Sequence, residues 1–273
     1  MKPTLVVDKS FLQGTTTRRM HELVESHQLL MTESLFYEIL SNDRDRAKCF
    51  SKFPAVENPA DLVMHVGGYL RKEISLRKIA PRPSESIIRT RFQFNPRLTQ
   101  PGFQLPVEAL EAQAEKLAEV HIDMKALIGR AATMPTIFPA AFTGTQQERD
   151  IARSLAEAAI ARDRGIPMSI YAAFRAPKGE RKPPPARYIE EDWAIYRWLQ
   201  VHLLFALDLA IRNLANLNNP LSASLHEKIE HDVLDAEYLI VGTLEGSFAT
   251  YERKLQRWFA LLCPRGTLVA NDG

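Results

Sequence analysis

The sequence predicts an α/β fold, with a parallel sheet flanked by helices, formed from both chain ends and interrupted by a mainly α-helical insertion. Three observations support this prediction. Residues 1–50 alternate short apolar runs with segments of helical spacing, which is typical of alternating strands and helices. Residues 221–273 resume the same alternation. In residues 51–220 the strand signals largely vanish and helical signals dominate, so this segment is expected to be the insertion.

The first fifty residues predict the order strand, helix, strand, helix. The apolar run 4–8 ends in Asp8, which is the pattern of a buried strand whose carboxyl end opens onto a site. A polar turn with Gly14 and three threonines is expected next. MHELVESH then has apolar positions at helical spacing, and QLLMT predicts a second strand. Thr32 can cap a helix through SLFYEILSN, because its hydroxyl can accept from a free backbone N–H.

Three long helices are expected in the insertion, over residues 107–129, 145–164 and 188–217. Thr145 and Glu148 have the spacing of a capping box at the start of the second helix. In the third helix Asp208 and Arg212 are four residues apart, which predicts a local ion pair on one helix face.

The C-terminal part predicts a helix, a strand, a helix and a strand. Ser224 and Glu227 resemble another capping box, and the helix that follows is expected to end near Glu245, where Gly246 supplies a stop. SFAT predicts a short strand and ERKLQRWFA a helix. A last strand is expected near LLC, ended by Pro264.

Composition is typical of a globular protein, and it favours a cytoplasmic location. The 273 residues are 45% hydrophobic and 25% charged, with a net charge of +2. The cysteines, Cys49 and Cys263, are far apart, so neither a disulfide framework nor a thiolate zinc site is indicated. Asp8 interrupts the N-terminal apolar run where a secretory signal would continue. The apolar stretch 198–211 falls short of the ~20 residues that span a bilayer, so no membrane association is expected.

Four carboxylates near the chain ends form the candidate catalytic set: Asp8, Glu38, Asp235 and Glu252. Each lies in a short segment of recognisable type. Hard divalent cations such as Mg²⁺ and Mn²⁺ prefer clustered oxygen ligands, and phosphodiester hydrolysis needs charge neutralised on the attacking and leaving oxygens. The set therefore predicts one acidic metal site assembled by the fold.

The two chain ends resemble the PIN-domain nuclease family. The resemblance rests on an Asp that ends the first strand in LVVDKSFL, a Glu early in the helix after the second strand in ESLFYEIL, and an Asp-Ala in VLDAEYLIVG. The family's Thr-x-Asp after the next strand is represented here by Thr250-Tyr251-Glu252. Glu in place of Asp keeps the ligand type but moves the carboxylate by one methylene, which puts a second metal position in doubt.

The resemblance implies a Mg²⁺- or Mn²⁺-dependent endonuclease without a covalent intermediate, most often acting on RNA and in toxin-like or defence-associated roles. It implies that the four carboxylates hold one or two ions, partly through water. Ser10 and Thr250 could then orient a water or a carboxylate, and Asp232 is a spare ligand one helical turn before Asp235. The plain alternatives are a turn or cap residue for Asp8, a surface position for Glu38, a helical ion pair for Asp235 and a helix start for Glu252.

A basic segment, residues 69–97, is the predicted nucleic-acid contact, because eight basic residues against two acidic ones give it a balance of +6. Tyr69, Phe92 and Phe94 offer faces for base stacking. The basic, proline-rich segment 175–187 is a second candidate, and a solvated face or an acidic protein partner is the alternative for both. The contact residues are Arg71, Lys72, Arg77, Lys78, Arg89, Arg91, Phe92 and Phe94.

Two other functions stay open. Arg197 and His202 have the R-x4-H spacing of HEPN-type ribonucleases, which cleave RNA without a metal, although a core histidine is the commoner outcome in an apolar helix. Alternatively the chain is a catalytically degenerate PIN-like scaffold that binds a protein partner through its helical insertion. P-loop and dinucleotide-binding motifs are absent from the sequence.

Overall fold

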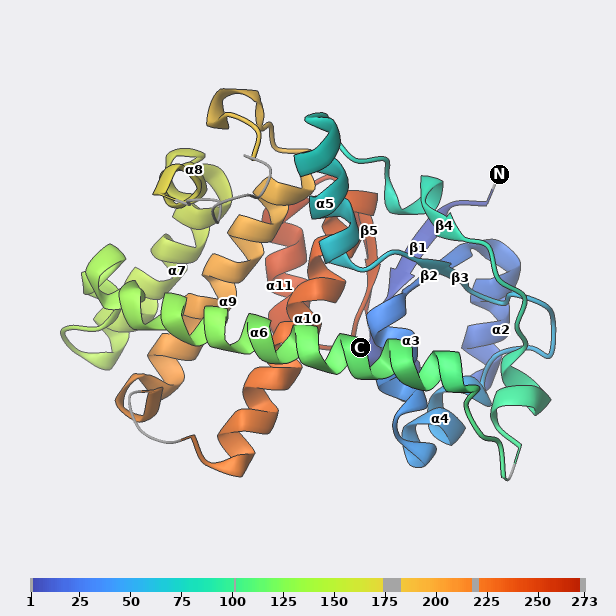
Figure 1. The fold of residues 1–273 in the computed structure, drawn as a ribbon. Coiled ribbons are helices and arrows are strands. Elements are labelled where there is room, and N and C mark those ends of the chain that lie inside the picture. Colours follow the sequence, from blue (N-terminus) through green and yellow to red (C-terminus); the bar gives the residue numbers. More distant parts are fainter. Residues whose placement is uncertain (1, 101, 174–182, 218–220, 271–273) are drawn as a thin grey trace. The chain divides into compact units, whose positions relative to one another are not determined.

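The computed structural model describes residues 2–100, 102–173, 183–217 and 221–270 (Figure 1). The chain forms two compact units. The first contains Met1–Tyr69, Pro81–Leu117 and Glu237–Gly273, and the second contains Leu70–Ala80 and Ala118–Ala236.

The first unit is built on a mixed, mostly parallel sheet of six strands in the order β4-β3-β2-β1-β5-β6. All neighbouring strands are parallel except β3 and β4. The predicted α/β class, with a sheet formed from both chain ends and flanked by helices, is therefore confirmed at this level. The strands are β1 Thr4–Val7, β2 Gln28–Thr32, β3 Asp61–Val63, β4 Ile87–Ile88, β5 Ser247–Ala249 and β6 Thr267–Val269.

Helices make up most of the rest of the described chain. The α-helices are α1 Lys9–Gly14, α2 Thr17–Ser26, α3 Glu33–Leu40, α4 Asp43–Phe50, α5 Val66–Leu76, α6 Val107–Ile137, α7 Gln146–Arg162, α8 Gly165–Ala173, α9 Ala194–Leu217, α10 Ala223–Glu245 and α11 Arg253–Leu262. Short 3-10 turns lie at Pro83–Glu85, Pro139–Ala141 and Ala186–Tyr188, and a π-type turn at Phe94–Leu98.

Strand β1 lies at the centre of the sheet, where both of its faces are covered, and its buried side chains are all apolar. Leu5, Val6 and Val7 are fully buried, and β2 lies on one side of the strand and β5 on the other. The predicted cap is also present, since Thr32 Oγ1 accepts from Leu35 N at 3.1 Å. This cap starts α3 directly at the carboxyl end of β2.

Several local predictions were wrong. Helix α1, which Asp8 caps, was not predicted; the expected break with Gly14 and the threonines lies after it, at Thr15 and Thr16 between α1 and α2. Helix α10 has its start near Ser222, whose hydroxyl accepts from Leu225 N, so the predicted Ser224 cap is not the one used. The strand expected near LLC is the end of α11, and the last strand, β6, follows it. The correctly predicted stop after α10 is Gly246, which has a positive φ of 83° that glycine adopts readily.

The first unit takes in more of the middle of the chain than expected. Strands β3 and β4 come from residues 61–63 and 87–88, which the predicted boundaries assign to the helical insertion. These strands have three and two residues, too few to show the alternation by which a strand is recognised in a sequence. The boundary at residue 50 is therefore misplaced.

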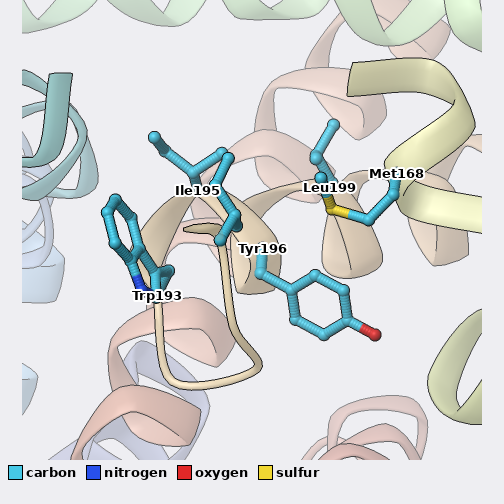
Figure 2. Packing of buried hydrophobic residues seen from close by; sticks show 6 residues of the cluster. Met168, Trp193, Ile195, Tyr196 and Leu199 are labelled. Carbon is cyan, nitrogen blue, oxygen red and sulfur yellow. The ribbon is translucent and has the colours of Figure 1, made fainter. Parts of the chain in front are cut away.

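The second unit is helical and has its own apolar core. Met168 of α8 packs with Trp193, Ile195, Tyr196 and Leu199 around the start of α9 (Figure 2). At the start of α7 the predicted capping box is present, with Thr145 N donating to Glu148 Oε2 at 2.7 Å and Glu148 N to Thr145 Oγ1 at 3.3 Å. Each bond satisfies one of the N–H groups that a helix start leaves free.

Helix α9, Ala194–Leu217, begins later than the predicted helix 188–217, but its apolar stretch is longer than predicted. Its segment Ala194–Leu214, 21 residues, has the length and hydropathy of a membrane span, and 83% of its most apolar window is buried inside the structure. The expectation that the apolar stretch is too short to span a bilayer was therefore wrong. Its burial is nevertheless what the core helix of a globular protein shows.

Candidate functional site

Three of the predicted acidic segments follow neighbouring strands of the sheet. Asp8 follows β1, Glu38 lies in the helix after β2, and Glu252 follows β5 by three residues. These strands are adjacent and parallel, so their carboxyl ends lie at one edge of the sheet. Open α/β sheets bind ligands at this edge.

The Asp8 carboxylate accepts hydrogen bonds from three different residues at this edge. Its Oδ1 accepts from Phe11 N at 2.7 Å, and its Oδ2 accepts from Thr250 Oγ1 at 2.6 Å. Ser10 Oγ lies 2.9 Å from both carboxylate oxygens. The carboxylate thus joins the end of β1, the start of α1 and the segment after β5.

Asp8 is also an electrostatically costly residue. It is 1% exposed, and burial raises its pKa from 3.8 to about 6, against the opposite effect of the hydrogen bonds from Thr250, Phe11 N and Ser10. The negative charge of Glu252 raises this pKa further. Among the described residues no Lys, Arg or His pairs with Asp8, so its charge is balanced only by neutral donors.

The segment after β5 brings two hydroxyls and a second carboxylate to Asp8. Thr250 and Ser10 have their hydroxyl oxygens 3.2 Å apart, and Tyr251 N donates to Ser10 Oγ at 3.0 Å. Glu252 N donates to Thr250 Oγ1 at 3.1 Å, while the exposed Glu252 side chain makes no capping bond to α11. The Glu252 carboxylate is therefore available to a ligand.

Glu38 belongs to a different bonding network. Its Oε1 accepts from Lys9 Nζ at 2.9 Å, and the same ammonium lies 2.9 Å from Asp45 Oδ2 of α4. Tyr238 of α10 donates its hydroxyl to Glu38 Oε2. Burial acts to lower the pKa of Lys9, but the charges of Glu38 and Asp45 outweigh it, so the pKa is raised and the ammonium stays charged.

The two predicted ligands on α10 belong to the second unit. Asp235 precedes Tyr238 by three residues on the helix, and its role as a ligand stays a prediction. Asp232 is nearly buried and lies 2.6 Å from Arg212 Nη2, which also pairs with Asp208 at 2.9 Å. The predicted Asp208–Arg212 pair is confirmed. The role of Asp232 as a spare metal ligand stays a prediction, and the structure pairs its carboxylate with the Arg212 guanidinium.

Of the four predicted carboxylates, Asp8 and Glu252 interact with each other across the sheet edge. Within the described ranges, no three His, Cys, Asp or Glu side chains are grouped so that they could hold a metal. Asp8 and Glu252 interact electrostatically, and two hydroxyls lie beside Asp8. Mg²⁺ is commonly held by one or two carboxylates together with waters and substrate phosphates, so these two residues could hold such an ion.

The aromatic residues of the basic segment 69–97 are not exposed as predicted. Phe94 is fully buried, with its ring centroid 4.4 Å from those of Phe50 and Phe53, so it cannot stack on a base. Tyr69 is fully buried too, and Phe92 is half-buried against Phe94. Aromatic rings in a polar segment gain more from joining a core than from facing water.

The basic residues of this segment are also divided between the two units. Arg89 and Arg91 are exposed in the first unit, where Arg91 pairs with Glu57 at 3.4 Å. The second unit contains Arg71, Lys72, Arg77 and Lys78. Of the other basic candidate, 175–187, residues 175–182 lie outside the described residues.

His202 of the R-x4-H pair is buried beside Arg130. His202 is 4% exposed, and burial followed by the charge of Arg130 lowers its pKa to about 3. Arg130 Nη1 lies 3.2 Å from His202 Nδ1, while Arg197 Nη1 donates to Gln200 Oε1 at 3.0 Å instead. A neutral, enclosed imidazole of this kind is typical of a core histidine.

Comparison with known proteins adds no family. No family model, curated protein or solved structure matches the chain. The PIN-like resemblance therefore stays a prediction that rests on the motifs.

Sequence reasoning missed three residues of the edge. Lys9 and Asp45 were not singled out, because a lysine beside an acid and an acid on a polar helix are ordinary patterns. Tyr238 carries a usable signal, since it lies one helical turn after Asp235 on a face that the motif already marks.

Proposed function

We propose that the protein is a divalent-metal-dependent endonuclease of PIN-like type, acting on RNA. The observation that carries the proposal is the state of Asp8: a buried carboxylate at the carboxyl edge of β1, without a cationic partner among the described residues and facing the charge of Glu252. Such a carboxylate gains most from a bound cation, because burial leaves its charge poorly solvated.

In this proposal Asp8 and Glu252 hold one Mg²⁺ or Mn²⁺ together with waters and a phosphate of the substrate. The ion would activate a water and stabilise the charge that develops at phosphorus. Ser10 and Thr250 fix the Asp8 carboxylate through their hydroxyls, so that its free lone pairs keep one direction. Glu38 holds Lys9 at the same sheet edge.

Exposed arginines of the first unit supply phosphate contacts. Arg82, Arg89, Arg91 and Arg97 are exposed, and guanidinium groups bind phosphates along a backbone without reading its sequence. The preference for RNA over DNA comes from the family resemblance, and a role as a toxin or in defence has the same basis.

The test is cleavage of single-stranded RNA and single-stranded DNA by the purified full chain, with Mn²⁺ or with EDTA. We expect Mn²⁺-dependent cleavage that Asp8→Asn and Glu252→Gln each reduce to background. Asp43→Asn is the control, because Asp43 is exposed and pairs only with Arg46 among the described residues. Asp235→Asn in the same assay tests the predicted fourth ligand. Cleavage by the Asp8→Asn protein at the wild-type rate would reject the proposal.

A non-catalytic scaffold is the second candidate. It is favoured by Lys9, because an ammonium that already neutralises Glu38 leaves this predicted ligand with less need of a metal ion. This candidate predicts no cleavage under any metal condition, so the same assay separates the two functions.

A further inference from the structure

Lys9 has an unusual place among the acids of the sheet edge. It directly follows Asp8 in the chain, and its ammonium lies 2.9 Å from Glu38 Oε1 and 2.9 Å from Asp45 Oδ2. The side chains of Lys9, Glu38 and Asp45 are 20%, 11% and 18% exposed, so all three are largely removed from water. One ammonium thus bridges two carboxylates that come from two different helices, α3 and α4.

Glu38 and Asp45 are arranged like two ligands of a cation, and the cation between them is the ammonium group of Lys9. Lys9 brings a single positive charge to the position between Glu38 and Asp45, and its departure would leave two partly buried carboxylates facing each other. A divalent ion placed there as well would be repelled by the ammonium, because like charges repel strongly where little water screens them.

We propose that Lys9 is a built-in cation that takes the place of a second metal ion at Glu38 and Asp45, so that the site works with one divalent ion. This inference rests on the proposed function. A lysine ammonium has three N–H donors, and two of them point to Glu38 and Asp45. The third is left to contact an oxygen of the substrate phosphate.

Neighbouring bonds keep this arrangement in place. Tyr238 donates to the second oxygen of Glu38, and Gln13 Nε2 donates to the second oxygen of Asp45 at 3.0 Å. The oxygen of each carboxylate that does not contact Lys9 is therefore held by a neutral donor. Replacing Lys9 by a neutral residue of similar length removes the positive charge that the two carboxylates share and leaves these donors in place.

The experiment counts the Mn²⁺ ions bound per chain by electron paramagnetic resonance and calorimetry. The variants are Lys9→Met, which keeps length and removes charge, Lys9→Met with Asp45→Asn, and Lys52→Met as control. Lys52 is a part-buried lysine of the same unit that donates to the carbonyls of Leu12 and Gln13 rather than to acids. Circular dichroism confirms that each variant is folded.

We expect one Mn²⁺ in the wild type and in Lys52→Met, two in Lys9→Met, and one again in the double variant. The cleavage rate below saturation should change from first order in Mn²⁺ for the wild type to second order for Lys9→Met. Two ions in the wild type, or one in Lys9→Met, would overturn the inference and leave the proposed function standing. A wild type that binds no Mn²⁺ and cleaves nothing would reject both.

Glu38→Gln provides a second test that does not depend on the folding of Lys9→Met. If Lys9 is the cation at Glu38, this variant binds its single Mn²⁺ with the wild-type dissociation constant. A dissociation constant raised roughly tenfold or more, which corresponds to about 1.4 kcal/mol, would make Glu38 a direct ligand and contradict the inference.

Discussion

Thr250 donates its hydroxyl to Asp8 at 2.6 Å, although the two residues are 242 positions apart in the sequence. The bond joins the carboxyl ends of β1 and β5, which pair through Val6 with Phe248 and Val7 with Ala249. Because neither residue is accessible to water, the bond has no solvent substitute. This hydrogen bond fixes the orientation of the Asp8 carboxylate, and the proposed metal site depends on that orientation.

Thr250→Val should therefore destabilise the fold. It removes a donor to a buried carboxylate while keeping the shape of the side chain, and such hydrogen bonds to charged groups contribute roughly 1.5–3 kcal/mol. We expect a loss of this size in the free energy of unfolding, measured by urea denaturation at pH 7.5. Thr90→Val, at an exposed position, is the control and should change stability by less than about 0.5 kcal/mol. Equal effects of the two substitutions would contradict the role of the bond.

Asp8 should make stability depend on pH in a defined direction. Its pKa is raised from 3.8 to about 6 in the folded chain, so the folded state disfavours the ionised form. The contribution of Asp8 is therefore fully present below pH 3.8 and is lost as the pH rises to about 6. A pKa raised by about two corresponds to a free energy of unfolding that is lower by roughly 3 kcal/mol when Asp8 is ionised.

Asp8→Asn removes this titration and keeps an acceptor for Phe11 N. Relative to the wild type, we expect the variant to gain stability between pH 4 and pH 7 in the presence of EDTA, measured by urea denaturation at each pH. Added Mn²⁺ should reverse the gain at pH 7 by stabilising only the wild type. A stability difference that does not vary with pH would show that the carboxyl titrates normally.

Local patterns in the sequence were sufficient to predict the elements around Asp8, but not the long-range partners. The apolar runs of β1 and β2 and the cap at Thr32 are signals within a few residues, and the structure has all three. The partner of Asp232 is Arg212, 20 positions away across a helix connection, and no local pattern encodes it. Phe94 shows the same limit, since an aromatic ring in a basic segment is equally compatible with a binding face and with a core.

The ion pairs of Arg212 should stabilise the second unit. Asp208 and Asp232 have side chains only 5% and 7% exposed, and Arg212 lies within 2.9 Å of both. Breaking a fully buried pair typically costs 3–5 kcal/mol, but Arg212 is 37% exposed and Asp208 keeps its pair with Arg153 at 2.6 Å, so the loss should be smaller. Arg212→Met should cost about 1–2 kcal/mol in urea denaturation, while the exposed Arg162→Met should cost little. Similar losses in the two variants would show that the network contributes no more than an exposed helical charge.

Substitution of His202 distinguishes metal-dependent cleavage from metal-independent cleavage. With its pKa lowered to about 3, His202 is neutral in the folded chain above that pH, and its contribution to stability is lost as the pH falls from 6.5 toward 3. His202→Gln keeps a polar group near Arg130 but removes the titration. We expect this variant to cleave RNA at the wild-type rate with Mn²⁺ and to lose less stability than the wild type between pH 6.5 and pH 4. Cleavage that survives EDTA and disappears in His202→Gln would instead make this histidine catalytic, because a structural role affects stability alone.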